Sequence, residues 1–456
     1  MAEYQTITKT KDLNETALVK LQQEKLARVK WSYFASILLG VWLIFNALSY
    51  SSGSQYIFYN NLLSGFAILI LGALSVSKKN DWMRWLLGTI GCWLLLAPLV
   101  FWAPTAQTYD SNTIIGTLLI TFSFLIPGMP RKASLSPGGK EIPPGWSFNP
   151  SSWEQRGPLI ALAIVGFFCA RYLASFQLGY IDTTWDPFFG SGTRNILTSD
   201  VSRSFPVSDA ALGAFSYMID ALAGFAGGKA RWRTMPWMVV LFGILIIPPG
   251  VTSITLVILQ PVAVGSWCSI CLFTAVVMLI MVPFAFDEIV ATLQYLYEVK
   301  KSGNPLWKTF WLGGEMEADE DEKRSEDKLQ DLGVWSILSG DGVTTPWFLI
   351  VSCLIGAWLM YAPTFFNYPE MVANIDYFSG ALIVTFAITS MAEICHSIRF
   401  LNIPIGAVLI LSPVFLESFS TASLAGQVAA GIVLILVNLP KAKINSRFGG
   451  LDKYIY

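Results

Sequence analysis

Twelve apolar runs, separated by polar segments, set the hydropathy pattern of this chain of 456 residues. A helix needs about 20 residues to cross the hydrocarbon core of a bilayer, and most of the runs approach that length. We therefore predict an all-α polytopic membrane protein with about twelve spans. Polar residues interrupt the sixth run, and the eleventh is short. The predicted spans are 32–50, 59–77, 83–103, 112–130, 158–178, 207–226, 236–258, 263–285, 347–366, 375–397, 402–416 and 422–440.

The composition supports a membrane location for most of the chain. Apolar residues make up 54% of it and charged residues 13%, whereas soluble proteins carry about 25% charged residues. Membrane lipid is therefore the expected neighbour of many side chains. The net charge of −1 gives no reason to expect a nucleic-acid partner. Residues 1–30 are polar and charged, without the apolar core of a cleavable signal peptide, so we expect no such signal.

Connections rich in lysine and arginine alternate with connections that are not, along the series of predicted spans. They precede the first span and follow each even-numbered span. Because short basic connections tend to stay on the cytoplasmic side, we predict that both termini are cytoplasmic. The start of the eighth span is then predicted at the extracytoplasmic face.

An internal repeat surrounds a different middle region. One unit is a helix with a G-x-W-L-like motif, a short loop and a return helix that contains glycine. In the return helices Gly65 corresponds to Gly380, and Gly116 corresponds to Gly431. Small residues at fixed positions let membrane helices pack closely. The four outgoing motifs are LGVWLIFN at 39–46, IGCWLLLAP at 90–98, IGAWLMYAP at 355–363 and IGAVLILSP at 405–413.

The middle region holds a C-x-x-C pair in the stretch VGSWCSICLFTA, residues 264–275. Ser266 is a plausible N-cap, which would put Cys268 in the first helical turn and Cys271 one turn later. Residues at i and i+3 share a helix face, and their Cα separation of roughly 5 Å suits a disulfide. The helix dipole would stabilise a thiolate at Cys268. We therefore interpret the pair as a redox centre, with Cys268 the more nucleophilic thiol if it is exposed.

Metal binding and simple packing are the alternatives for cysteine in this chain. A structural zinc site needs four ligands, and the sequence has no second cysteine pair. The single histidine, His396, is predicted at the opposite end of another helix, so we expect no metal. The remaining cysteines are interpreted as packing residues: Cys92, Cys169, Cys353 and Cys395.

The order of these features resembles two known families. Residues of about 150–300 resemble the vitamin K epoxide reductase family: a span opens at Pro158, the loop DPFFGSGTRNILTSDVSRSFPVSDAALGA follows at 186–214, and WCSICLFTA opens the last span. The flanking helix pairs resemble the SPW repeat family. The first resemblance implies a four-helix bundle around a quinone, capped by the loop. It also implies a multi-pass protein of the bacterial inner membrane.

The resemblance also implies roles for single residues. Cys271 would face the quinone, either ubiquinone or menaquinone, and Cys268 would exchange disulfides with a thioredoxin-like extracytoplasmic protein. Thr198 or Ser199 would match a loop Ser/Thr near the active cysteines. Aromatic loop residues would cover the pocket or rest on the membrane surface. The catalytic candidates are Cys268 and Cys271, and the cofactor-binding candidates are Trp267, Phe188, Ser191, Thr198, Ser199 and Phe205.

Two departures from the family pattern keep a second function open. The loop lacks the family's pair of relay cysteines, and Ser191 is the best match to the second of them. Ala275 stands where a quinone-binding tyrosine often follows the C-x-x-C. Either an external thiol reaches Cys268 directly, or the chain is a non-catalytic scaffold or quinone-binding module. A transporter is a third class, but the spans offer few intramembrane charges for a transport path.

We therefore predict a central four-helix reductase-like bundle with two flanking four-helix SPW-repeat units. Its function would be that of a quinone-linked thiol oxidoreductase. The predicted boundaries are a cytoplasmic N-terminal segment at 1–30, SPW-repeat helix pairs at 31–130, a linker at 131–156, the reductase-like domain at 157–300, a charged cytoplasmic linker at 301–345, SPW-repeat helix pairs at 346–440 and a cytoplasmic tail at 441–456.

Overall fold

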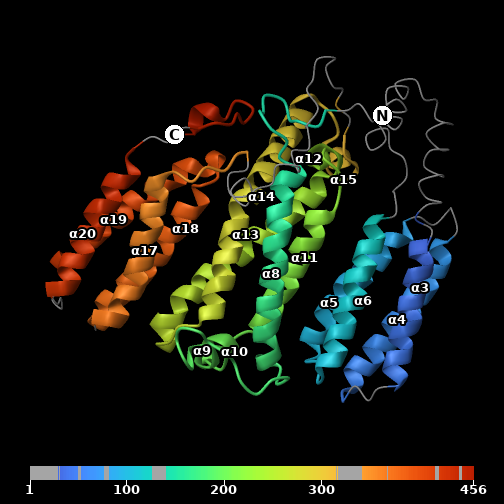
Figure 1. The fold of residues 1–456 in the computed structure, drawn as a ribbon. Helices are drawn as coiled ribbons and strands as arrows, with labels where there is room; N and C mark the ends of the chain where they lie inside the picture. The colour runs from blue at the N-terminus through green and yellow to red at the C-terminus, as the bar shows by residue number, and fades with distance from the viewer. Residues whose placement is uncertain are drawn as a thin grey trace.

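A computed structural model describes most of the chain, and helices dominate it (Figure 1). The predicted N-terminal segment 1–30, apart from residue 29, and most of the charged linker, including its charge run, lie outside the described residues. So does the first part of the linker at 131–156. The described residues are 29, 31–49, 53–76, 82–125, 140–314, 316, 341–366, 368–415, 421–440 and 444–455.

Each predicted span corresponds to a helix, which confirms the all-α fold. Nine helices in the described ranges are long and apolar enough to cross a membrane, so this is an integral multi-pass protein. The count of twelve spans stays a prediction, because α6, α11 and α20 are not among the nine. The twelve helices are α3 (Trp31–Ser49), α4 (Gln55–Ser75), α5 (Met83–Val100), α6 (Ala106–Leu125), α8 (Trp153–Gln177), α11 (Asp209–Phe225), α13 (Pro236–Leu259), α14 (Ser269–Lys301), α17 (Trp347–Phe366), α18 (Glu370–Thr389), α19 (Asn402–Phe415) and α20 (Thr421–Asn438).

Some helix bounds differ from the hydropathy runs. The helix α14 begins six residues after the predicted start at 263, because a π-helical turn (Gln260–Val264) and a left-handed Gly265 with φ +65° come first. The helix α18 ends at Thr389, and a 3-10 helix (Glu393–Leu401) takes up the rest of the predicted span. Hydropathy averages over such turns, since their residues are as apolar as those of the helix.

The repeated glycines lie where paired helices cross. A Cβ added to Gly65 would lie 3.0 Å from the Gly40 carbonyl oxygen, and a Cβ added to Gly380 would lie 2.5 Å from that of Gly356. These contacts leave no room for a side chain at the crossing of α3 with α4 or of α17 with α18. The pairs Gly91/Gly116 and Gly406/Gly431 make the same crossing in α5/α6 and α19/α20. The repeat seen in the sequence is therefore a repeat of helix-pair geometry.

The helices α8, α11, α13 and α14 form the middle of the molecule, between α3–α6 and α17–α20 (Figure 1). Their shared core includes Ala163, Tyr217, Phe242 and Met281. One end of this bundle carries α9 (Gly192–Leu197) and α10 (Asp200–Arg203). The opposite end carries α12 (Arg231–Thr234), α15 (Leu306–Leu312), residues 140–152 and the C-terminal segment. The candidate site lies at the end with α9 and α10.

Candidate functional site

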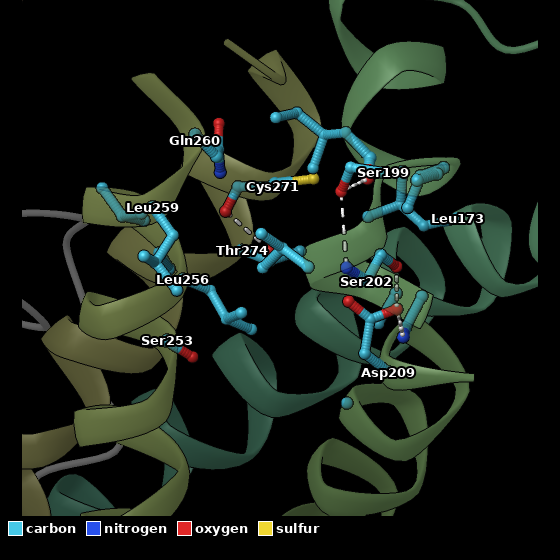
Figure 2. Close-up of a pocket in the computed structure, with 18 of the residues that line it drawn as sticks. Leu173, Ser199, Ser202, Asp209, Ser253, Leu256, Leu259, Gln260, Cys271 and Thr274 are labelled. Atoms are coloured by element: carbon cyan, nitrogen blue, oxygen red, sulfur yellow. Dashed lines mark hydrogen bonds between the residues drawn. The ribbon is translucent and has the colours of Figure 1, made fainter. Parts of the chain in front are cut away.

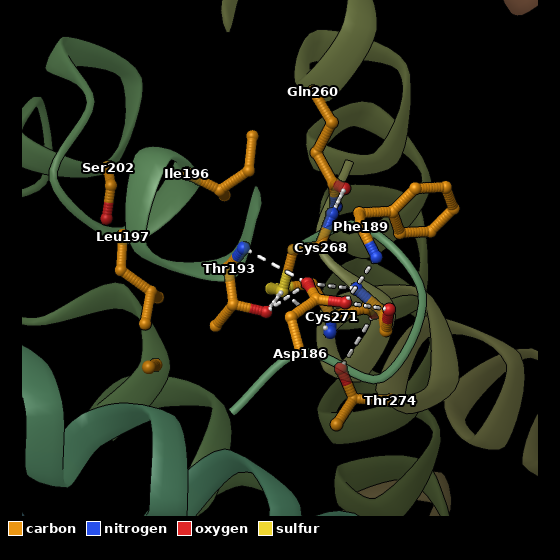
Figure 3. The surroundings of a disulfide bond; sticks show 12 residues. Asp186, Phe189, Thr193, Ile196, Leu197, Ser202, Gln260, Cys268, Cys271 and Thr274 are labelled. Atoms are coloured by element: carbon orange, nitrogen blue, oxygen red, sulfur yellow. Dashed lines mark hydrogen bonds between the residues drawn. A yellow bond between two sulfur atoms is a disulfide. The ribbon is translucent and has the colours of Figure 1, made fainter. Parts of the chain in front are cut away.

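A disulfide joins Cys268 and Cys271 at the start of α14, with a Cα separation of 5.3 Å (Figure 3). The sequence predicted this separation but not the helix start. Cys268 is itself the N-cap of α14, and its Sγ accepts a hydrogen bond from the Cys271 amide at 3.0 Å. Ser266 does not cap the helix; its Oγ accepts a hydrogen bond from Asn195 Nδ2 at 3.2 Å instead. A thiolate at Cys268 would thus be stabilised both by the helix dipole and by a direct N–H donor.

Gln260 fixes the backbone of the first cysteine. It lies in the π-helical turn that ends α13, and it is 4% exposed. Its Oε1 accepts a hydrogen bond from the Cys268 amide at 2.9 Å. Its Nε2 has no hydrogen-bond partner among the described residues, although Gln260 lines the neighbouring cavity. One side chain thus positions Cys268 and offers a free donor beside Cys271.

Cys268 lies beneath the short helix α9 and is 0% exposed. The Oγ1 of Thr193 is 3.4 Å from the Cys268 Sγ. Gly192 makes this close approach possible, since a Cβ there would lie 1.9 Å from the Trp267 carbonyl oxygen. Exposure was the condition for Cys268 to act as the more nucleophilic thiol, and this conformation does not meet that condition. The loop closes over the sulfur that would receive an external thiol.

Asp186 holds the loop on the start of α14 (Figure 3). Its carboxylate accepts hydrogen bonds from the Thr193 Oγ1 at 2.6 Å and from the Ser269 amide at 3.2 Å. It also accepts from the Ser269 hydroxyl and from the amides of Phe188 and Phe189. Burial alone would raise the pKa of Asp186, but these hydrogen bonds outweigh it and hold that pKa well below its ordinary value. The carboxylate is therefore ionised, and it fastens the cap at neutral pH.

A cavity of about 130 Å³ lies beside the disulfide, and Cys271 lines it (Figure 2). An apolar cavity of roughly 150 Å³ accepts one benzene-sized ring, so this space suits a single ring. Most of the wall is apolar: Ala170, Leu173, Ile196, Leu197, Val201, Leu256, Val257, Leu259, Val264 and Ala275. The arrangement is typical of small-molecule sites, which are largely apolar with a few placed polar groups.

The polar groups of the cavity are mostly paired with one another. The Asp209 Oδ1 accepts hydrogen bonds from the Ser202 Oγ at 2.9 Å and from the Gln177 Nε2. The Tyr217 hydroxyl donates to the Thr274 carbonyl oxygen at 2.6 Å. By contrast, the Nε2 of Gln260 is a free donor that a ring carbonyl could use. A quinone ring fits this combination of an apolar wall, a free donor on Gln260 and a neighbouring sulfur.

The predicted binding residues are not all at the cavity. Ser199 lines it and caps α10 by accepting from the Ser202 amide at 3.3 Å. Trp267 is buried beside the disulfide and contacts Phe189 and Tyr377, with ring centroids 6.4 and 5.7 Å away. The other four lie away from the cavity wall: Ser191 and Thr198 are exposed, Phe188 is 81% exposed and Phe205 is half-buried.

Sequence reasoning missed Asp186 and Gln260 and misplaced the loop contact. Thr193 contacts Cys268, whereas the family resemblance pointed to Thr198 or Ser199 as the loop hydroxyl near the cysteines. Gly190 is left-handed with φ +61°, and α9 winds after it. Gln260 had one signal, since it is an isolated polar residue in the apolar run ITLVILQPVAV at 254–264. In the parts of the chain that the structure describes, no group of His, Cys, Asp and Glu is arranged to hold a metal.

Comparison with known proteins matches two kinds of domain. Residues 158–286 match the vitamin K epoxide reductase family. Residues 30–125 and 346–441 match the SPW repeat domain. No curated protein and no solved structure matches the chain. Both family matches agree with the resemblances drawn from the sequence.

Proposed function

Because the chain carries a vitamin K epoxide reductase family domain between two SPW repeat domains, we propose that it is a membrane thiol–disulfide oxidoreductase. It takes electrons from an extracytoplasmic thiol partner and passes them to a membrane quinone. The carrying observation is the position of the disulfide: Cys268 lies under the loop, and Cys271 lines a ring-sized cavity. The sulfur of Cys268 is thus covered by the loop, and Cys271 is the cysteine at the cavity.

The loop side accounts for exchange with a thiol partner. A partner thiolate attacks the Cys268 Sγ, and the Cys268–Cys271 bond breaks, leaving a thiolate on Cys271. The partner's second thiolate then attacks the partner's first sulfur, which is bonded to Cys268 in the mixed disulfide. The bond to Cys268 breaks, and Cys268 leaves as a thiolate. The Cys271 amide, which donates a hydrogen bond to the Cys268 Sγ at 3.0 Å, is placed to stabilise that charge. Because Cys268 is closed off, α9 has to move before a protein thiol can reach it.

The cavity side accounts for reoxidation of the two thiols. A quinone bound there accepts two electrons and two protons and becomes a hydroquinone. Cys271 lines the cavity and would supply its sulfur to the ring, and Cys268 would then attack that sulfur to restore the disulfide. The two protons come from the two thiols, so the reaction balances. The Gln260 Nε2 would donate to a ring carbonyl and orient it beside Cys271.

One observation favours a second function. The loop has no cysteine, and Thr193 occupies the place beside Cys268 where a relay thiol would have to be. A hydroxyl cannot carry electrons. A quinone-binding module or membrane scaffold without turnover would show the same cavity and the same closed cap.

Thiol counting separates these two functions. The test protein replaces Cys92, Cys169, Cys353 and Cys395 with alanine, so that only Cys268 and Cys271 carry thiols. It is reduced without oxygen in lipid nanodiscs and mixed with a short-chain ubiquinone or menaquinone. We expect both thiols to disappear while one hydroquinone forms for each pair of thiols lost.

The matched control replaces Cys271 with serine in the same background, and its remaining thiol should persist. Thiols that persist in the parent protein while the quinone still quenches tryptophan fluorescence would support the binding module and exclude turnover.

A further inference from the structure

Three buried oxygen atoms at the end of the bundle opposite the disulfide have no hydrogen-bond donor. Two belong to the carboxylate of Asp287 in α14, which is 0% exposed, and the third is the Oε1 of Gln155 in α8, which is 1% exposed. This holds for the part of the chain that the structure describes. An unpaired buried acceptor destabilises the folded state, and an unpaired buried charge does so more strongly. A proton or a cation would remove this cost.

The two side chains flank one dipeptide. The Gln155 Nε2 donates a hydrogen bond to the Asp341 carbonyl oxygen. A Cβ on the next residue, Gly342, would lie 2.3 Å from the Asp287 Oδ2, so the carboxylate lies against that backbone. Turning the Gln155 amide over would place its oxygen against the Asp341 carbonyl oxygen, which is repulsive. The hydrogen bond from the Gln155 Nε2 to the Asp341 carbonyl oxygen therefore fixes the amide orientation and leaves the Gln155 Oε1 without a donor.

The neighbouring arginines bind other groups. Glu288, the next residue in α14, accepts hydrogen bonds from the Arg231 Nε at 2.6 Å and from the Ser151 hydroxyl. Arg156 donates through Nη1 to the carbonyl oxygens of Gly224, Ala226 and Gly227 at 3.1–3.2 Å, while its Nε and Nη2 have no partner among the described residues.

The nearby Glu393 already has donors of its own. Its carboxylate accepts hydrogen bonds from the backbone amides of Asn445 and Ser446 at 3.1 and 2.9 Å. Asp287 is thus the one carboxylate of this group whose two oxygens both lack a partner among the described residues.

We propose that Asp287 and Gln155 form part of a buried site for one alkali cation, Na⁺ or K⁺. Oxygen-only donors favour hard cations over transition metals. One carboxylate is neutralised by one positive charge, which avoids an uncompensated charge in the interior. The cation would tie α8 and α14 to the segment at 341–342 that leads into α17. This site is separate from the redox centre and does not depend on the proposed function.

Thermal unfolding of the full chain in detergent tests this site. The midpoint is measured at fixed pH and ionic strength in NaCl, KCl or N-methyl-D-glucamine chloride. A ligand that binds only the folded state raises the midpoint in a saturable way. We expect a rise of several degrees in Na⁺ or K⁺ over N-methyl-D-glucamine. The substitution Asp287→Asn should abolish the difference, and Gln155→Met should shift the response to higher cation concentration.

Asp220 provides the matched control. It is also 0% exposed with two unpaired carboxylate oxygens, but it lies on α11 away from Gln155. Asp220→Asn should keep the full cation response. Equal midpoints of the wild-type protein in all three salts would overturn the proposal and leave a protonated Asp287 as the explanation. A midpoint raised by CaCl₂ and by neither alkali salt would also overturn it. Both outcomes are read on the wild type, so they hold even if Asp287→Asn fails to fold.

Discussion

The two SPW repeat domains share one helix arrangement but differ in the polar pair at their centre. In each return helix a polar residue lies four positions before the crossing glycine. In the N-terminal domain the Asn112 Nδ2 donates to the Asn61 Oδ1 at 3.0 Å. In the C-terminal domain the Gln427 Nε2 donates to the Asp376 Oδ1 at 2.6 Å. The same position therefore holds a neutral amide pair in one copy and an amide–carboxyl pair in the other.

The two domains also differ in what they contact. The N-terminal domain meets α8 through Asp110, which pairs with Arg171 at 2.7 Å. The C-terminal domain reaches the redox site, since Tyr377 packs on Trp267 and Tyr361 on Phe189, with centroids 5.7 and 6.2 Å apart. One copy thus supports the bundle from outside, and the other supports the residues that cover Cys268. The shared fold comes from the glycines, and the different roles come from the polar and aromatic positions.

The largest expected effect on the free energy of unfolding comes from exchanging Asn and Asp at the centres of the two domains. Asn61→Asp would bury a carboxylate whose donors are the neutral amides of Asn60 and Asn112, with no cation to compensate its charge. Uncompensated buried charges cost roughly 3–5 kcal/mol. Asp376→Asn keeps the oxygen that accepts from Gln427 and should change the free energy of unfolding by less than about 1 kcal/mol. Chemical denaturation of both variants in detergent checks this. Equal losses would show that the two centres are equivalent and would break the comparison.

The crossing glycines should give the next largest effect. Gly380→Ala would force a methyl group to within 2.5 Å of the Gly356 carbonyl oxygen, whereas in Gly65→Ala the nearest atom is the flexible Ile44 side chain at 2.6 Å. Overpacking costs about 1–3 kcal/mol, and we expect Gly380→Ala to be the costlier change. It should also slow quinone-dependent loss of the two thiols, while Gly65→Ala should not. The reverse order of rates would count against a role of the C-terminal domain at the redox site.

The helices and the disulfide could be predicted from the sequence because both depend on local pattern. Long apolar runs define spans, and an i, i+3 cysteine pair at a helix start has the right spacing wherever the helix lies. The cap could not be predicted in the same way. The contact of Thr193 with Cys268 depends on the turn at Gly190, and the role of Gln260 depends on a π-helical turn. These positions are set by packing between segments far apart in the sequence, which hydropathy does not report.

The helix α9 that covers Cys268 gives the next test, because the C-terminal domain contacts the residues beside it. Asp186→Asn removes the charge that holds α9 on α14, and hydrogen bonds to charged groups contribute roughly 1.5–3 kcal/mol each. The lowered pKa means that this stabilisation is complete at neutral pH and is lost only as the pH falls below the ordinary carboxyl range. We expect a water-soluble dithiol to reduce the Cys268–Cys271 disulfide about tenfold faster, which corresponds to ~1.4 kcal/mol. Asp182→Asn, at an exposed position four residues before Asp186, is the control, and an equal increase there would refute the role of Asp186.

The smallest expected effect concerns the aromatic contact between the C-terminal domain and the redox site. Tyr377→Ala removes the ring that packs on Trp267, next to Cys268, and such pairs contribute about 0.5–1.5 kcal/mol. The disulfide should then be reduced a few times faster, and Tyr377→Phe should behave like the wild type because the ring remains. Tyr109→Ala is the matched change in the N-terminal domain, where the ring lies 3.7 Å from the Arg171 guanidinium carbon. It should lower the free energy of unfolding without changing the reduction rate. If both alanine variants speed reduction equally, the redox site senses general loosening of the bundle, and the C-terminal domain has no special part in covering Cys268.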